Sequence, residues 1–384
     1  MSPSFDPIHP ISFDIPERKR RNLVLFLLTM ALSLFGIVMI YSASAYGAER
    51  SMGDAFYYVK KQGIALIVGT VAMIAISYVD PYRIKKLRYV ILAISFLLLG
   101  VIFLPAVGVV SYGARRWINL GFMTMQPSEI SKFGYVIYAA SFLSDNGIET
   151  FRKIFLVLLP GIIMCVLIML EPNMSITMCV LAVMLFMLIV GGISVKKIIL
   201  LVIPALVLVP LLIWIEPYRL KRLMAFLDPW ASPKAEGYQL IQSYYALCRG
   251  GFFGVGLFCS RQKYLFLPFA ESDFIFSIIG EELGLVGAVA TIMVFLALIY
   301  FGFVTASRAG TRFEALLAAG ITSLIAIQTA VNLAVVTGCI PPTGLPLPFV
   351  SAGGSSLVSF MSAVGVLLSV NRHSSTTFAE RHKM

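Results

Sequence analysis

A single aspartate stands where a polar segment of the chain meets a long apolar run. Asp273 precedes the apolar residues 274–279, and Glu281 and Glu282 follow about two turns later, roughly 12 Å deeper at 1.5 Å per residue. Ionisable groups inside a membrane span are costly, so they usually face a cavity and mark a functional path. An ordinary aspartate, with a pKa of about 3.9, is a weak base, and desolvation at a membrane edge would raise that pKa and suit the group for taking a proton. The structural alternative is an Asp273 that caps its helix.

The elements that must position this residue are membrane helices. Hydrophobic residues make up 59% of the 384 residues and charged residues only 13%, and the mean hydropathy is +0.90. Backbone groups cannot stay unpaired in lipid, and the alternation of a barrel is absent, so the spans are helices. We expect an all-α polytopic membrane protein of about ten transmembrane helices, with a large outward loop between spans seven and eight. The expected spans are 23–45, 62–79, 87–107, 127–144, 154–171, 173–192, 196–216, 272–305, 312–337 and 349–370.

The basic residues predict how these spans are oriented. Most Lys and Arg residues of the short loops, such as those at 18–21 and 83–88, fall on the side that holds both termini. That side is expected in the cytoplasm, which makes the chain a multi-pass protein of the cytoplasmic (inner) membrane. The net charge of +11 is mainly this topological signal, and no basic and aromatic array suggests nucleic acid. The expected division is a disordered cytoplasmic tail at 1–22, one bundle at 23–371 with a large extracytoplasmic loop at 216–270, and a cytoplasmic tail at 372–384.

Polar residues of the outward loops are candidates for binding an anionic substrate. The loop 216–270 is rich in Lys and Arg; such a surface at lipid level would suit a lipid-linked diphosphate, although long loops escape the orientation rule and also gain basic residues by chance. Arg115 is a natural phosphate ligand, and together with Trp117 it is also a common type of membrane anchor. Glu129 and Lys132 lie three residues apart on one helical face, close enough to pair, either in the site or as a neutralised structural pair.

A proline-rich segment follows Asn332. Four prolines between residues 341 and 348 indicate a broken or re-entrant backbone, which is tolerated at membrane depth only against protein or a wet cavity. Such a loop could cap a site, or it could simply reverse the chain.

Cysteine and histidine place limits on the chemistry. Cys248, Cys259 and Cys339 fall in outward loops, where a disulfide is permitted but not required. The three histidines all lie in the tails, and no cluster has the spacing of metal ligands. Histidine-based catalysis is therefore excluded.

Several motifs between about residues 23 and 371 point to one family. They are Gly113 to Trp117, Gln126-Pro127-Ser128-Glu129, Phe226-Leu227-Asp228-Pro229-Trp230, Gly237 to Ser243, Asp273-Phe274-Ile275-Phe276, Gly280-Glu281-Glu282-Leu283-Gly284 and Pro341 to Ser356. In this order they resemble the SEDS family, polytopic peptidoglycan polymerases of shape, elongation, division and sporulation. The forms around Trp230 and Gln242 are more similar to the division members, FtsW, than to the elongation members, RodA. The chain departs from the family pattern at Phe269, where a glutamate is usual, and around Cys248, where the family has a Gly-Ser-Gly-Gly run.

The resemblance implies a peptidoglycan glycosyltransferase that polymerises lipid II into β-1,4 glycan at the outer face of the membrane. Asp273 matches the family's essential aspartate and would take the proton of the acceptor 4-hydroxyl as undecaprenyl diphosphate leaves. Cations must offset the charge of that diphosphate, either basic side chains or a divalent cation (Mg or Mn); no cofactor is certain. The expected substrate-binding residues are Arg115, Trp117, Gln126, Glu129, Lys132, Arg222, Asp228, Gln242, Lys263, Asn332 and Ser351. Glu281 and Glu282 are expected to gate or pack, paired with a buried cation.

The expected partners are lipid II, a class B penicillin-binding transpeptidase and other division membrane proteins. Two other functions stay open. One is a flippase for the same lipid, which would need a polar path through both halves of the membrane. The other is a non-catalytic scaffold for division proteins. The short cytoplasmic loops favour the polymerase.

Overall fold

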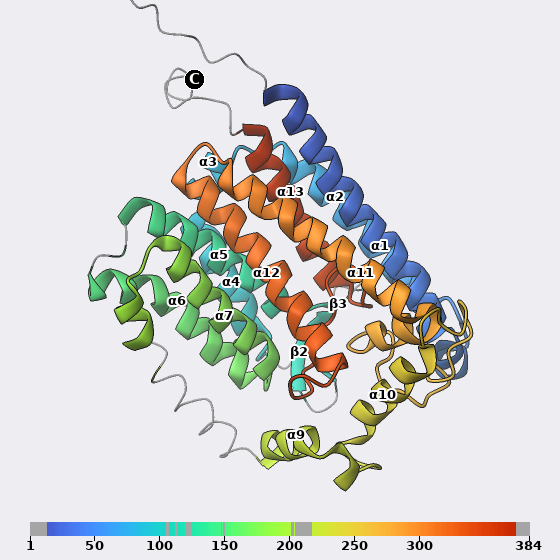
Figure 1. The fold of residues 1–384 in the computed structure, drawn as a ribbon. Coiled ribbons are helices and arrows are strands. Elements are labelled where there is room, and N and C mark those ends of the chain that lie inside the picture. The colour runs from blue at the N-terminus through green and yellow to red at the C-terminus, as the bar shows by residue number, and fades with distance from the viewer. Residues whose placement is uncertain are drawn as a thin grey trace, which may run out of the picture.

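The protein is a bundle of helices (Figure 1). The first and last described residues lie at one end of the bundle, and the short helices within residues 217–250 lie at the other. The computed structural model describes residues 14–373, apart from 105–106, 112–113, 120, 122–123, 147, 149, 201–202 and 204–216. Helix α1 (Asp14–Met52) begins and helix α13 (Gly354–His373) ends at one end of the bundle, here called the terminal end. Helices α9 (Pro217–Leu227) and α10 (Tyr238–Gly250) lie at the opposite end, the loop end.

The remaining elements fall into long helices and short connecting pieces. They are α2 (Tyr57–Ser77), α3 (Pro81–Lys86), α4 (Arg88–Val101), β1 (Gly108–Ser111), β2 (Ala114–Asn119), β3 (Thr124–Met125), α5 (Pro127–Asn146), α6 (Phe151–Leu170), α7 (Met174–Gly191), the 3₁₀ helix η1 (Pro229–Ala231), α11 (Ile275–Ser307) and α12 (Arg312–Val336).

Seven helices in the described part of the chain are long and apolar enough to cross a membrane: α1, α2, α6, α7, α11, α12 and α13. The predicted spans 87–107 and 127–144 correspond to α4, which has only 14 residues, and to α5, whose first turns carry Glu129 and Lys132. The predicted span 196–216 falls largely outside the described residues.

Helix α1 is longer than the span predicted for it. Its 39 residues extend roughly 58 Å at 1.5 Å per residue, well beyond a hydrocarbon core of about 30 Å. The helix begins at Asp14, so residues 14–22 of the segment expected to be a disordered tail are helical; residues 1–13 and 374–384 of the two expected tails lie outside the described residues.

The centre of the bundle is built from α12 and α13, the most buried of the spans. Helix α13 lies especially close to α2, because Gly365 has no side chain to separate the two backbones. A Cβ at Gly365 would lie only 2.6 Å from the carbonyl oxygen of Met73.

The fold is mostly helical, as expected, and its one departure among the described residues is a short three-stranded antiparallel sheet. Strand β2 lies between β1 and β3, with Ser111 opposite Ala114 and Ile118 opposite Met125. These strands occupy a stretch that the sequence predicts as a polar loop. Strands this short give too few alternating positions to be recognised among longer apolar runs.

The segment 216–270, predicted as one large loop, is partly helical. Its described residues include α9, η1 and α10, and α10 packs against α11. All five cysteines of the chain are free, so Cys248, Cys259 and Cys339 form no disulfide in this structure.

The close contact of α2 and α13 gives a direct test of the packing. We expect Gly365→Ala to lower the free energy of unfolding by about 1–3 kcal/mol, because the added methyl group must push two backbones apart. The matched control is Gly63→Ala on α2, where a Cβ meets nothing within 4 Å; there the better helix former should stabilise by up to about 1 kcal/mol. Thermal unfolding of the detergent-solubilised protein measures both, and equal effects would contradict the packing.

Candidate active site

Asp273 lies at the loop end, two residues before α11 begins. Its side chain is half-buried, and a Cβ on Gly344 would lie 3.4 Å from its Oδ2 atom. The carboxylate therefore faces the proline-rich connection between α12 and α13. The N-cap residue of α11 is Phe274, with no side-chain cap, so Asp273 does not serve as the helix cap.

The backbone around Asp273 is held by α12 and by the connection between α12 and α13. Asn332 Nδ2 donates to the carbonyl oxygens of Asp273 at 2.9 Å and Leu345 at 2.8 Å. Ser351 Oγ donates to the carbonyl oxygen of Ser272 at 2.5 Å. Asn332 and Ser351, predicted to bind substrate, thus bind the main chain that carries the aspartate.

The surroundings of Asp273 favour its neutral form. Burial raises the pKa of Asp273 to about 7; the positive charge of Arg222 opposes this rise, Glu271 adds to it, and Arg116 opposes it more weakly. Arg222 lies on α9, and its Nη1 atom donates to the carbonyl oxygen of Pro342 at 3.3 Å. The structure therefore brings the predicted cation Arg222 and the predicted base together.

The second cation near the aspartate is Arg116, whereas the sequence favours Arg115. Side chains alternate along a strand, and on β2 the side chain of Arg115 is exposed while that of Arg116 is partly buried. Arg116 Nε donates to the carbonyl oxygen of Glu171 at 2.9 Å, and its Nη2 to that of Pro172 at 2.5 Å. Trp117 is half-buried on the same strand. Recognising a strand here would have separated the two arginines.

Glu171, at the turn between α6 and α7, is a site residue that sequence analysis missed. Its side chain is 1% exposed, and neither carboxylate oxygen has a hydrogen-bond partner in the described part of the chain. Burial raises the pKa of Glu171 to about 8, against the effect of Arg116. At the start of α7, Ser175 Oγ accepts from Gly344 N at 3.2 Å. A carboxylate at the end of the predicted span 154–171 was the available signal.

Glu129 and Lys132 pair as predicted, but they lie below the surface of the site. The Lys132 Nζ atom lies 2.9 Å from Glu129 Oε2 and 2.5 Å from Gln328 Oε1, and both charged side chains are 1% exposed. Gln328 Nε2 in turn donates to the carbonyl oxygen of Pro346 at 2.9 Å. The pair therefore supports the proline-rich connection from beneath, which is the role of a neutralised structural pair.

Three other predicted substrate-binding residues are Asp228, Gln126 and Gln242. Asp228 Oδ1 accepts from Trp230 N and Ala231 N at 3.1 and 3.2 Å and so begins η1. The main-chain N–H of Gln126 donates to Ser355 Oγ at 3.2 Å. Gln242 is half-buried on α10.

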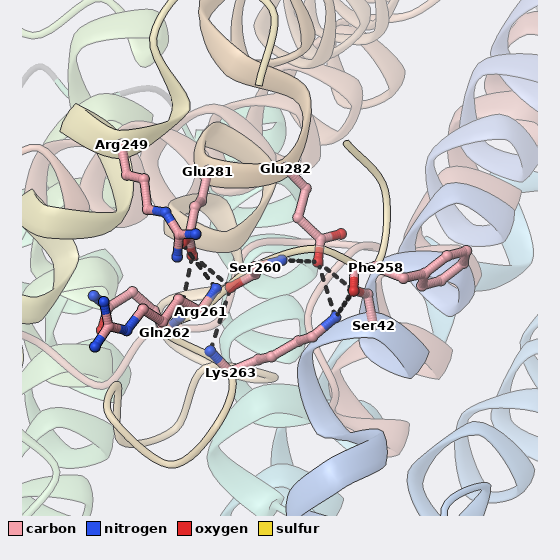
Figure 2. Close-up of polar contacts among 9 residues, drawn as sticks. All are labelled: Ser42, Arg249, Phe258, Ser260, Arg261, Gln262, Lys263, Glu281 and Glu282. Atoms are coloured by element: carbon pink, nitrogen blue, oxygen red, sulfur yellow. Dashed lines mark hydrogen bonds and ion pairs between the residues drawn. The ribbon is translucent and has the colours of Figure 1, made fainter. Parts of the chain in front are cut away.

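Lys263 belongs to a separate buried cluster around Glu281 and Glu282 (Figure 2). Its Nζ atom lies 3.3 Å from Glu282 Oε1, while Arg249 Nη1 lies 3.2 Å from Glu281 Oε1. The interpretation that these glutamates pair with a buried cation is confirmed for Glu282, whereas Arg249, the partner of Glu281, is 43% exposed. Lys263 is therefore engaged deeper in the bundle than Asp273.

A cavity of about 600 Å³ opens beside this cluster. The end of α1, the start of α2 and the segment 263–271 form its walls, so hydroxyl groups, Arg50 and Glu271 line it together with apolar side chains. Among the described residues, no group of three or more His, Cys, Asp or Glu side chains could hold a metal ion. The described residues near Asp273 thus do not fit a divalent cation held by the protein alone.

The chain matches known proteins along nearly its whole length. Stage V sporulation protein E of Bacillus subtilis (strain 168) is 39% identical over 357 residues, which cover 92% of this chain and 97% of that protein. The probable peptidoglycan glycosyltransferase FtsW of Geobacter metallireducens is 39% identical over 363 residues, covering 93% and 96%.

Solved structures agree with this relationship. A structure described as "Structural coordination of polymerization and crosslinking by a peptidoglycan synthase complex" contains a chain that matches with a TM-score of 0.78 and 27% identity, covering 92% of this chain and 98% of that one. The rod shape determining protein RodA of Thermus thermophilus shares the fold, with a TM-score of 0.67 and 24% identity. The family model described as "Cell cycle protein" (FtsW/RodA/SpoVE) matches residues 22–376. The resemblance found in the sequence is confirmed, and the chain belongs to the FtsW/RodA/SpoVE family of cell cycle proteins.

Proposed function

We propose that this protein is a peptidoglycan glycosyltransferase that polymerises lipid II into β-1,4 glycan strands during cell division and releases undecaprenyl diphosphate. The observation that carries the proposal is Asp273, a half-buried carboxylate at the loop end of the bundle whose pKa burial raises and on which Arg222 and Arg116 act. The family and the FtsW proteins at 39% identity support the reaction.

In the proposed reaction the Asp273 carboxylate takes the proton of the acceptor 4-hydroxyl while that oxygen attacks C1 of the donor sugar. The C1–O bond to the lipid diphosphate breaks, and its electron pair leaves with the diphosphate. One in-line displacement turns an α-linked donor into a β-linked product, so one base suffices and no covalent intermediate forms. Arg222 and Arg116 are the cations placed to offset the charge of the diphosphate, because both already act on Asp273.

The setting proposed for this reaction follows from the distribution of charge. The clusters at 18–21 and 83–88 belong to the terminal end, so we place that end and both termini in the cytoplasm, with the loop end outside. We further propose ten spans, one within residues 196–216, in a single bundle of the inner membrane. The partner proposed is a class B penicillin-binding transpeptidase, because the similar chain of known structure comes from a peptidoglycan synthase complex.

The first test removes the base. We expect Asp273→Asn to lower glycan synthesis from labelled lipid II at least about 100-fold, the contribution of a general base, when the transpeptidase partner is supplied. Glu17→Gln is the matched control, since Glu17 is an exposed carboxylate that pairs with Arg308 at the terminal end of the bundle, and it should retain wild-type activity. Equal glycan from wild type and Asp273→Asn would refute the assignment. If the protein moves lipid II across vesicle membranes but makes no glycan, a flippase is favoured instead. If it shows neither activity, a scaffold is favoured.

The second test is the pH dependence of the rate. Only the carboxylate form of Asp273 accepts a proton, so with a pKa of about 7 the rate should rise with pH through about 7. Arg222→Gln removes the main charge that lowers this pKa, and we expect its acidic limb to move to higher pH by up to about one unit. Arg308→Gln, whose partner Glu17 lies at the terminal end, should leave the limb in place. The kcat/KM profile measures these shifts, and a limb that moves downward in Arg222→Gln would contradict the assignment.

The third test is stability. The folded pKa of Asp273 lies above the ordinary 3.8, so the folded state holds this proton more tightly than the unfolded state, and stability from this group is lost as pH rises through about 7. Asp273→Asn cannot ionise and should have a higher Tm than wild type at pH 8, with the difference shrinking at pH 5. A lower Tm for Asp273→Asn at pH 8 would show that the ionised carboxylate does not lower the free energy of unfolding.

A further inference from the structure

Helix α11 is broken one third of the way along, and another segment fills the break. At Gly284 the backbone has φ 67° and ψ −166°, a conformation that no continuous helix contains. In an unbroken helix the carbonyl groups of residues 281 and 282 would accept from the N–H groups of 285 and 286. Here they accept from Val255 N and Gly256 N, both at 3.0 Å.

The exchange is reciprocal. The N–H groups of Leu285 and Val286 donate to the carbonyl oxygens of Gly251 and Phe252 at 2.9 and 3.1 Å. Residues 250–263, here called the inserted segment, thus satisfy main-chain groups that would otherwise be unpaired inside an apolar bundle, where each costs several kcal/mol. Gly254 permits this close approach, because a Cβ there would lie only 2.1 Å from the carbonyl oxygen of Glu282.

Two buried carboxylates fix the inserted segment in place (Figure 2). Glu281 accepts from Arg261 N at 2.9 Å, Gln262 N at 3.3 Å and the Ser260 hydroxyl, besides Arg249. Both of its oxygens therefore face main-chain donors. Glu281 is fully buried, so a carboxylate there is stable only with these bonds.

Glu282 differs from its neighbour in one respect. Its Oε1 atom accepts from Ser42 Oγ at 2.6 Å, Ser260 N at 3.1 Å and Lys263 Nζ at 3.3 Å. Its Oε2 atom has no partner among the described residues. In Glu282→Gln, the amide oxygen could keep the contacts of Oε1, and the amide nitrogen would take the place of the Oε2 atom, which has no partner among the described residues.

The attachment reaches Asp273 through a short closed loop. Residues 260–274 run from the Glu281 contacts to the start of α11, so both ends of this loop lie on one helix. Within the loop, Leu267 N donates to the carbonyl oxygen of Gln262 at 3.0 Å and Ser272 N to that of Phe269 at 3.1 Å. Residues 260–274 thus connect the Glu281 contacts to Asp273.

We propose that Glu281 and Glu282 are positioning residues for the reaction: by holding the inserted segment in the break of α11, they keep the loop 260–274 closed and the Asp273 carboxylate desolvated. This role rests on the function proposed above. Glu281 carries the larger share, because its two oxygens bind main-chain donors on both sides.

The test measures kcat/KM with lipid II as a function of pH. It follows the acidic limb, the pH range in which kcat/KM rises as Asp273 ionises. Glu281→Gln turns an amide nitrogen toward a main-chain N–H, loosens the loop and hydrates Asp273, so the limb should move to lower pH by about one unit or more and kcat should fall about tenfold. Glu282→Gln should move the limb less. Arg222, Glu271 and Arg116, the charged groups facing Asp273, are unchanged in both variants, so a shift reports hydration.

The matched control is Glu314→Gln at the terminal end. Glu314 is equally buried and accepts from the main-chain N–H groups of Gly310 and Thr311. It should lose thermal stability, yet its acidic limb should stay at the wild-type pH. If Glu281→Gln loses stability in the same way without moving its limb, the glutamates only stabilise the fold and the proposal is overturned.

A milder variant covers the case in which Glu281→Gln does not fold. Arg249, one partner of Glu281, has a side chain that is 43% exposed. Arg249→Gln removes this partner and should move the acidic limb in the same direction by a smaller amount. An unmoved limb overturns the proposal. Asp273→Asn in the same assay separates the two proposals. If that variant is active the function fails, whereas an inactive Asp273→Asn with an unmoved limb in the glutamate variants rejects only the positioning role.

Discussion

The free-energy cost of keeping charge away from water governs the loop end of this bundle. A buried carboxylate or ammonium is stable only when hydrogen bonds or an opposite charge replace its hydration. Glu281 obtains these from main-chain N–H groups and Arg249, and Lys132 obtains them from Glu129 and Gln328. Each compensation fixes a neighbouring segment, so the same contacts that make the charges tolerable also define the geometry.

Asp273 is where this compensation is incomplete. Burial outweighs the arginines that act on it, which is why its pKa rises to about 7 instead of falling. Its main chain, by contrast, is firmly held by Asn332 and by the connection that contains Ser351. A fixed backbone beneath a poorly solvated carboxylate is what a general base near neutral pH requires.

Hydropathy and the unusual position of one carboxylate were enough to predict most of the arrangement of the helices. The apolar runs at 272–305 and 312–337 correspond closely to α11 and α12, because lipid permits few alternatives to a helix. Asp273 stood out because a carboxylate at a membrane edge needs a reason. The pairing of Glu129 with Lys132 followed from helical spacing.

The errors share a physical cause: contacts between distant segments leave no periodic signal. Nothing near Asn332 reveals that its amide holds the carbonyl group of Asp273, 59 positions earlier in the chain. Lys263 looked like a phosphate ligand because its partner Glu282 lies on another element. The sequence favours Arg115 over Arg116 because it predicts a loop where the structure has a strand of six residues. The break at Gly284 likewise depends on the segment that fills it.

That break has a mechanical consequence. The nine residues of α11 before Gly284 and the longer part after it are both bonded to the segment that follows α10, through the carbonyl groups of residues 281 and 282 and the N–H groups of residues 285 and 286. Gly284 is the point at which the two parts meet, so a tilt of α10 would change the angle between them. Asp273 lies two residues before the short part, so such a change of angle at the surface would move its carboxylate relative to the long part.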